Sequence, residues 1–164
     1  MVGAVAVMID KDTTPPEVLL VQHSYRKKGA WGLPGGSLES LPGDPRSPRN
    51  ESSGDDVIET ALRREVSEEL GIEVDSVDFL RIDAIPYVAE EPGPYRLDFY
   101  FRCDPKQGFG GLRDGLRSGQ VSPRSPEVSQ IRLVPLDELS EYDLYSSDKR
   151  LLSDDLPRLV PDLF

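Results

Sequence analysis

The chain alternates between short apolar runs and stretches rich in glycine, proline and serine, and the apolar runs predict β-strands. Residues 3–9 (GAVAVMI) and 17–24 (EVLLVQHS) have the composition of strands and are separated by the turn-rich segment DKDTTPP. Residues 77–89 and 95–104 follow with strand-like alternation and aromatic side chains. Residues 127–139 predict a last strand that runs into a turn. The pattern therefore predicts a domain built largely from strands.

The clearest helical period lies in residues 55–70 (DDVIETALRREVSEEL), where apolar residues recur on one side at about 100° per residue. Asp56 with Glu59 three residues later has the form of a capping box, and Gly71 is well placed to end the helix. A C-terminal helix is predicted to begin near Ser147 and to include KRLLSDDL. Strands before and after one helix, with a later helix, predict an α/β (α+β) domain with a mixed sheet covered on both faces.

Two segments rich in glycine, proline and serine interrupt these elements and are interpreted as loop insertions. The first covers residues 40–54 (SLPGDPRSPRNESSG) and the second residues 105–126 (PKQGFGGLRDGLRSGQVSPRSP). The second contains the near-repeat GLRDG and GLRSG, and it carries Arg113, Arg117 and Arg124. These arginines either lie on a solvated loop or reach the outer phosphates of a substrate.

Length and composition are those of a single globular domain covering residues 1–164. The net charge of −11 argues against a nucleic-acid polymer as partner, because binding to a phosphate backbone needs clustered lysine and arginine. The apolar runs are far shorter than a membrane-spanning helix, and the N-terminus reads as a strand and not as a signal peptide. Cys103 is the only cysteine, which excludes an intrachain disulfide, and we expect a cytoplasmic protein without membrane contact.

Three glutamates in the predicted helix, Glu65, Glu68 and Glu69, are spaced i, i+3, i+4 and therefore share one side of it. Their angular positions fall inside the apolar arc that packs on the sheet, so we expect all three to face inward. Carboxylates about 6 Å apart repel by roughly 2–3 kcal/mol per pair at an effective dielectric near 20, and burial adds a desolvation cost. Either some of them carry protons or a cation lies among them. Hard oxygen ligands of this kind favour Mg²⁺ or Mn²⁺ over zinc.

The segment GAWGLPGGSLE, upstream of the helix, places small residues where a backbone must bend or approach another group closely. Together, LPGGSLE and RREVSEELGI resemble the box of the Nudix hydrolase family, G-x5-E-x7-R-E-U-x-E-E-x-G-U, in which U is aliphatic. The matched positions are Gly36, Arg64, Glu65, Val66, Glu68, Glu69, Gly71 and Ile72. The stretch from Gly36 to Asp56 is longer than the pattern, in line with the insertion at residues 40–54. Asp56 stands where the family usually has glutamate, and it is either a residue of the box or a helix cap.

The resemblance implies an α/β/α sandwich around a central mixed β-sheet, in agreement with the predicted order of elements. It also implies Mg²⁺- or Mn²⁺-dependent hydrolysis of the diphosphate linkage in a nucleoside diphosphate derivative, by metal-activated water. On this resemblance Glu65, Glu68 and Glu69 ligate the metal, and the carbonyl of Gly36 adds a further ligand. Arg64 is expected to orient a glutamate. A bound metal also explains how an acidic protein attracts an anionic, small-molecule nucleotide substrate.

The general base and the substrate stay open at the level of sequence. Some family members use the glutamate that matches Glu65 as the base, and others use a loop glutamate, for which Glu127 is the candidate. Aromatic residues available to stack on a nucleotide base are Trp31, Tyr25 and Tyr87. Pro86 matches a marker of members that cleave ADP-ribose, and Tyr87 a marker of members that act on dinucleoside polyphosphates. The two markers compete, and a nucleoside triphosphate is a third candidate substrate.

Two other classes of function stay open. One is a non-catalytic Nudix-like module that binds a nucleotide or regulates a partner, although such modules commonly lose the box carboxylates that are present here. The other is an isoprenoid diphosphate isomerase of the same fold, which needs a catalytic cysteine and has only Cys103 as a candidate. Family members are commonly homodimers, but no sequence feature requires a homodimer here.

Overall fold

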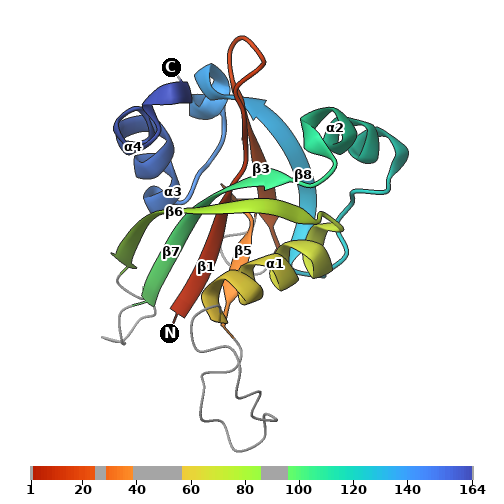
Figure 1. Cartoon of the computed structure of the whole chain (residues 1–164), viewed down its shortest axis with the longest axis horizontal. Coiled ribbons are helices and arrows are strands. Elements are labelled where there is room, and N and C mark those ends of the chain that lie inside the picture. The colour runs from red at the N-terminus through yellow and green to blue at the C-terminus, as the bar shows by residue number, and fades with distance from the viewer. Residues whose placement is uncertain (1, 25–28, 39–56, 86–95, 164) are drawn as a thin grey trace, which may run out of the picture.

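The computed structural model describes residues 2–24, 29–38, 57–85 and 96–163, and Figure 1 shows their arrangement. Several sequence expectations concern residues outside these ranges. They are the loop insertion at residues 40–54, the capping residue Asp56, the marker Pro86, and the proposed stacking residues Tyr25 and Tyr87.

The first sheet contains four strands in the order β5-β1-β7-β6. Their bounds are β1 Val2–Val7, β5 Gly35–Ser37, β6 Val74–Ile85 and β7 Arg96–Pro105. β1 runs parallel to β7 and antiparallel to β5, and β6 runs antiparallel to β7, so the sheet is mixed. The short antiparallel pairing of Gly36 with Ala4 brings the glycine-rich segment to the edge of this sheet.

The second sheet is antiparallel and centres on β3 (Glu17–His23), which pairs with β2, β4 and β8. The other strands are β2 Ile9–Asp10, β4 Trp31–Gly32 and β8 Val128–Pro135. The predicted first strand therefore divides at the buried Met8, and its two parts belong to different sheets. The predicted α+β class is confirmed. The structure has two central sheets, one mixed and one antiparallel, where a single mixed sheet was predicted.

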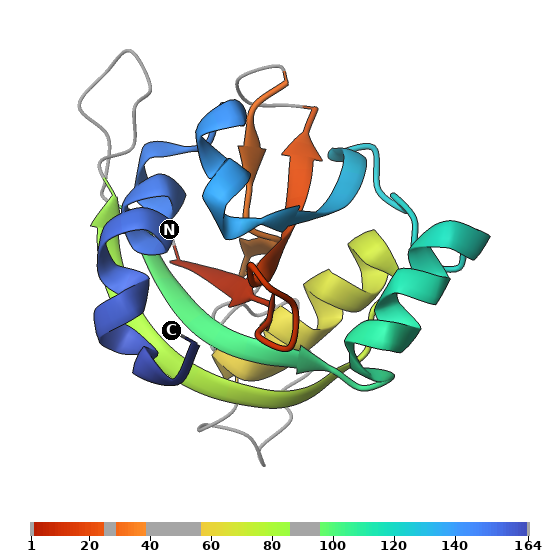
Figure 2. The same cartoon turned by 90° about the horizontal axis from the view of Figure 1, so that it is seen from above.

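Helices cover opposite faces of the first sheet because successive residues of β1 point to opposite sides. Ala4 and Ala6 belong to the apolar cluster that also contains Leu62, Val66 and Leu70 of α1 (Val57–Leu70). Val5 and Val7 belong to a second cluster with the leucines of the C-terminal helical segment. This segment consists of α3 (Ser146–Arg150), a π-helical stretch (Leu151–Asp155) and α4 (Leu156–Leu159), followed by a 3₁₀ turn (Pro161–Leu163). Figures 1 and 2 show it and α1 as separate layers.

The prediction of a loop over residues 105–126 holds for residues 119–126 but was wrong for residues Gly108–Ser118, which form helix α2. Its apolar residues Phe109, Leu112 and Leu116 have helical spacing and pack into the first cluster, but four glycines among its residues concealed the period. Arg113 is tied to the second sheet by ion pairs with Asp10, at 2.7 Å, and with Glu17. Arg113 is therefore a structural residue and not a solvated loop arginine.

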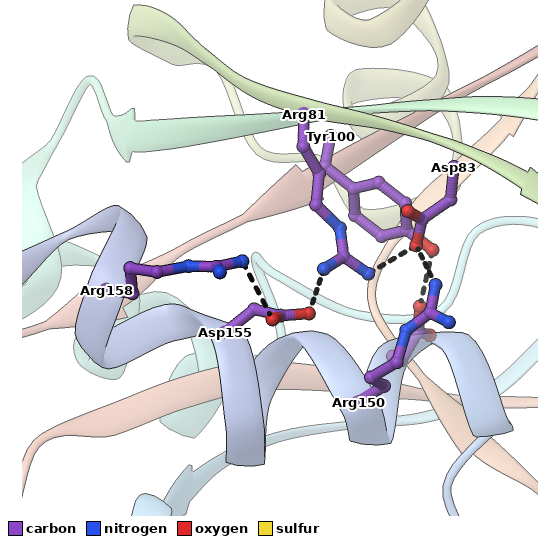
Figure 3. Close-up of polar contacts among 7 residues, drawn as sticks. Arg81, Asp83, Tyr100, Arg150, Asp155 and Arg158 are labelled. Atoms are coloured by element: carbon purple, nitrogen blue, oxygen red, sulfur yellow. Dashed lines mark hydrogen bonds and ion pairs between the residues drawn. The ribbon is translucent and has the colours of Figure 1, made fainter.

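An ionic network joins the C-terminal helical segment to the first sheet (Figure 3). Arg81 of β6 contacts Asp83 of its own strand and Asp155 of the helical segment. Arg150 pairs with Asp83 and Arg158 pairs with Asp155, both at 3.2 Å. The network fixes the layer opposite α1, on the side of the sheet away from the glutamates. None of the helices in the described part of the chain is long and apolar enough to cross a membrane.

Candidate active site

Helix α1 buries two of the three box glutamates. Glu65 and Glu69 are 9% and 6% exposed, as expected from their position inside the apolar arc. The side chain of Glu68 is 62% exposed, so the expectation that it faces inward was wrong. Glu68 lies at the margin of the arc, where a long side chain can turn out to solvent at low cost. Two carboxylates, not three, are therefore removed from water in this structure.

Gly36 and Glu65 are in direct contact, and the contact requires glycine. Pairing with Ala4 of β1 holds the backbone of Gly36 beside α1. A Cβ atom at position 36 would lie 2.6 Å from Cδ and 2.7 Å from Oε2 of Glu65, closer than real Cβ contacts allow. The absence of a side chain at position 36 therefore makes the space that the Glu65 carboxylate occupies.

Arg64 bridges two box carboxylates. One terminal nitrogen donates to Oε1 of Glu65 at 2.7 Å, and the other donates to Oε2 of Glu68 at 3.1 Å. This geometry is the one expected of a residue that orients a glutamate, because a guanidinium is a planar fork with donors in fixed directions.

Replacing Arg64 with lysine should lower kcat by about tenfold while leaving the melting temperature nearly unchanged. Lysine keeps the positive charge, but its single ammonium group cannot hold both carboxylates in fixed directions. Steady-state kinetics of the proposed hydrolysis would check this, with Arg117→Lys as a control because Arg117 is exposed on α2. Equal kinetics for Arg64→Lys and the wild type would remove Arg64 from its orienting role.

The pKa of the Glu69 carboxyl group is strongly perturbed. Burial, followed by the negative charges of Glu65 and Glu127, raises its pKa to about 7, and the nearby Arg64 only partly offsets this. Its Oε2 atom is buried, and no residue in the described part of the chain donates a hydrogen bond to it. A buried carboxylate oxygen without a donor is costly unless a proton or a cation satisfies it.

Glu127 lies close enough to Glu69 for their charges to interact. Backbone contacts bring its loop to this position: the amide of Arg124 donates to the carbonyl of Glu69 at 2.7 Å, and the amide of Ser24 donates to the carbonyl of Glu127 at 2.9 Å. The side chain of Glu127 is exposed, so it is accessible to solvent. The fold thus gathers Gly36, two buried glutamates of α1 and one loop glutamate in one region.

The donors in this region suit a hard divalent cation. They are carboxylate oxygens and the backbone carbonyl of Gly36, and Mg²⁺ and Mn²⁺ prefer such oxygen ligands. Within the described ranges, no three acidic, histidine or cysteine side chains already converge on one point. Arg64 holds the oxygens of Glu65 and Glu68, while Oε2 of Glu69 is left to a cation or a proton. By the chemistry of their oxygen donors, the residues present suit a hard divalent cation such as Mg²⁺ or Mn²⁺.

The structure does not support two other residues singled out from the sequence. Trp31 is only 7% exposed and packs edge-on against Tyr142 in the second apolar cluster, with ring centroids 5.3 Å apart. Its ring is part of the core and does not present a face to a nucleotide base. Cys103 is fully buried, and burial raises the pKa of its thiol to about 12, so it is neither accessible nor a thiolate at neutral pH. The isomerase interpretation loses its required nucleophile.

A family model and solved structures identify the class of protein. The NUDIX domain model matches residues 1–155, and the chain therefore belongs to the Nudix family. A MutT Nudix hydrolase from Burkholderia pseudomallei is 20% identical with a TM-score of 0.65, and the match covers 94% of this chain and 96% of that one. No curated protein matches the chain.

Two further similar structures come from NrtR of Shewanella oneidensis. Its Nudix domain, complexed with ADP ribose, is 17% identical with a TM-score of 0.64, and the match covers 98% of this chain and 88% of that one. NrtR complexed with a 27mer DNA is 16% identical with a TM-score of 0.60, and the match covers 98% of this chain and 63% of that one. At these identities the likeness shows the fold and not the activity.

Proposed function

We propose that this protein hydrolyses the diphosphate linkage of a nucleoside diphosphate derivative and depends on Mg²⁺ or Mn²⁺. The observation that carries the proposal is a pair of buried carboxylates on one helix: Glu65 lies against the backbone of Gly36, and Oε2 of Glu69 has no donor in the described part of the chain. Burying a carboxylate is costly unless a partner, a proton or a cation satisfies it, and Oε2 of Glu69 has no partner in the described part of the chain. Family membership supports hydrolase chemistry in general.

The residues of the chain supply the ligands and the proton acceptor. The proposed ligands are Glu65, Glu69 and the Gly36 carbonyl, because both glutamates are buried and Gly36 contacts Glu65, and the exposed Glu68 is a further candidate. Bound metal would neutralise the diphosphate and increase the acidity of a water molecule. The water oxygen attacks one phosphorus, the bond from that phosphorus to the bridging oxygen breaks, and two phosphate-containing products leave. Glu127, which is exposed and near Glu69, is our choice to accept the proton, with Glu65 as the alternative.

The proposed substrate is a nucleotide sugar such as ADP-ribose, a dinucleoside polyphosphate or a nucleoside triphosphate. The complex of the NrtR Nudix domain with ADP ribose supports the first of these, because that domain shares the fold of this chain. The formal net charge of −11 favours a substrate that is recognised through a bound cation and not through a basic surface.

A second candidate is a non-catalytic nucleotide-binding or regulatory module. The similarity to NrtR, which has been solved with a DNA fragment, favours this alternative. The burial of Glu65 against Gly36, together with the burial of Glu69 on the same helix, favours the hydrolase.

A substrate panel distinguishes the two candidates. Release of phosphate-containing products would be measured from ADP-ribose, diadenosine tetraphosphate, NADH and oxidised nucleoside triphosphates, with Mg²⁺ and with a chelator. Cleavage that requires metal and is lost in Glu69→Gln supports the hydrolase and identifies the substrate class. If no compound is cleaved while one of them raises the melting temperature, the protein is a binding module.

A further inference from the structure

A buried carboxylate lies in the layer opposite α1. Asp148 lies in α3 and is 6% exposed. Its Oδ2 accepts a hydrogen bond from the backbone amide of Leu33 at 2.9 Å, and its Oδ1 accepts one from the hydroxyl of Tyr100 at 3.2 Å. Leu33 lies in the glycine-rich segment that ends at the candidate active site. A buried acid of the C-terminal helical segment thus contacts the backbone that leads to Gly36.

The contact is close because residue 32 is a glycine. A Cβ atom at Gly32 would lie 2.8 Å from Oδ2 of Asp148 and 2.8 Å from Cδ2 of Tyr145. The carboxylate of Asp148 therefore packs against the backbone of Gly32, immediately before the Leu33 amide that donates a hydrogen bond to it. The absence of a side chain at Gly32 leaves space for the Asp148 carboxylate, as the absence of one at Gly36 leaves space for the Glu65 carboxylate.

Backbone hydrogen bonds hold the segment before and after Leu33, but its own amide donates to a side chain. Trp31 donates its amide to the carbonyl of Asp143 at 2.9 Å, and its carbonyl accepts from the amide of Tyr145 at 3.1 Å. The carbonyl of Pro34 accepts from the amide of Ala6 at 2.8 Å. Asp148 thus holds the backbone at Leu33 through its side chain. Leu33 is three residues before Gly36 of the candidate site.

We propose that Asp148 is a positioning residue, whose carboxylate holds the segment Leu33–Gly36 in register against Glu65 and thereby preserves the metal site. The inference rests on the proposed function. Metal and catalytic sites tolerate little displacement of their ligands, since a shift of about 1 Å removes much of a ligand's effect. Gly36 lies against the Glu65 side chain, so a shift of this segment displaces the Glu65 carboxylate or the Gly36 carbonyl.

The test compares substitutions of Asp148 at pH 8. Burial raises the pKa of the Asp148 carboxyl to about 6, so the wild-type group is an anion that accepts both hydrogen bonds under these conditions. Mn²⁺ affinity without substrate would be measured by electron paramagnetic resonance, together with kcat, KM and the melting temperature. Asp148→Ala should weaken Mn²⁺ binding and lower kcat by about 10- to 100-fold, with KM for the nucleotide changed by less than about threefold.

Asp148→Asn should recover both properties to within about threefold, because an amide oxygen can accept from Leu33 and an amide NH₂ can donate to the Tyr100 oxygen. Asp154→Ala is the matched control, since Asp154 is an exposed acid of the same helical segment. If Asp148→Ala does not fold, Asp148→Glu replaces it. The longer side chain keeps the charge but crowds Gly32, and it should weaken Mn²⁺ binding while Asp148→Asn does not.

The outcomes separate this inference from the proposed function. A wild-type protein that binds no Mn²⁺ and cleaves nothing overturns both. A wild-type protein that binds and hydrolyses, with Asp148→Ala or the glutamate variant binding Mn²⁺ equally well, overturns only the positioning role. A rise in KM alone would also overturn it, because that result assigns Asp148 to direct substrate contact.

Discussion

Replacing Glu69 with glutamine is expected to abolish hydrolysis and, at the same time, to stabilise the metal-free protein at alkaline pH. Glutamine has nearly the same size as glutamate but no negative charge. Loss of this charge weakens metal binding, and it also removes the desolvation cost of a buried carboxylate in the metal-free protein. Loss of a partner that only supports a ligand commonly costs 10- to 100-fold, so losing the ligand itself should cost at least about 100-fold in kcat.

The sign of the stability effect follows from proton binding. The pKa of Glu69 is about 7 in the folded protein against an ordinary value of 4.5, so between these pH values the folded state holds the proton more tightly than the unfolded state. The favourable contribution of the protonated carboxyl is complete below about pH 4.5 and is lost as the pH rises through 7. Glutamine stays neutral and avoids this loss, which is on the order of 3 kcal/mol above pH 8.

Chemical denaturation in the presence of chelator, at pH 5 and at pH 8.5, measures the difference. Glu69→Gln should be the more stable protein at pH 8.5, and the two should be nearly equal at pH 5. Glu73→Gln is the matched control, since Glu73 lies just beyond the same helix and its side chain is 68% exposed, beside Lys106. A Glu69→Gln protein that is destabilised equally at both pH values would show that Glu69 is held by hydrogen bonds and not strained by burial.

The sequence indicated the helical part of the candidate site because the box glutamates are close together in the chain. The i, i+3, i+4 spacing in α1 fixes the direction of Glu65 and Glu69 relative to the apolar arc, and both are buried. The same geometry could not decide Glu68, because its angle lies at the margin of the arc and the contact with Arg64 turns it to solvent. The angular position of a residue on a helix fixes the direction of its Cα–Cβ bond. The position of the terminal group of a long side chain depends on the residues around it.

The remaining differences come from contacts between residues far apart in the chain. Helix α2 was missed because its period depends on Phe109, Leu112 and Leu116 meeting the core, which outweighs the poor helix propensity of its glycines. Trp31 was expected at the substrate, but a short strand buries it against Tyr142. The link between Asp148 and the amide of Leu33 spans more than a hundred positions and leaves no periodic signal in the sequence.

Replacing Gly36 with alanine should disable the site while leaving the fold intact. The backbone of Gly36 does not have a positive φ, so alanine can adopt it without conformational strain. The added methyl group would meet Cγ, Cδ and Oε2 of Glu65 at 2.6–2.8 Å, and these atoms belong to a flexible side chain that can move. Movement of Glu65 costs the fold little but displaces a carboxylate of the proposed metal site, so we expect a loss of about 100-fold in kcat and in Mn²⁺ affinity.

Gly110→Ala is the matched control for this prediction. A Cβ atom at Gly110 of α2 would meet nothing within 4 Å, and alanine in a helix should raise stability by about 0.5–1 kcal/mol without changing activity. The decisive measurement is the double variant Gly36→Ala with Glu65→Gln. If the methyl group acts only through Glu65, the double variant should be no less active than Glu65→Gln alone, because both changes remove the same group from the site. If the fold-losses in kcat of the two single variants multiply in the double variant, Gly36 contributes independently of Glu65. We would then assign the effect of the methyl group to a displaced Gly36 carbonyl.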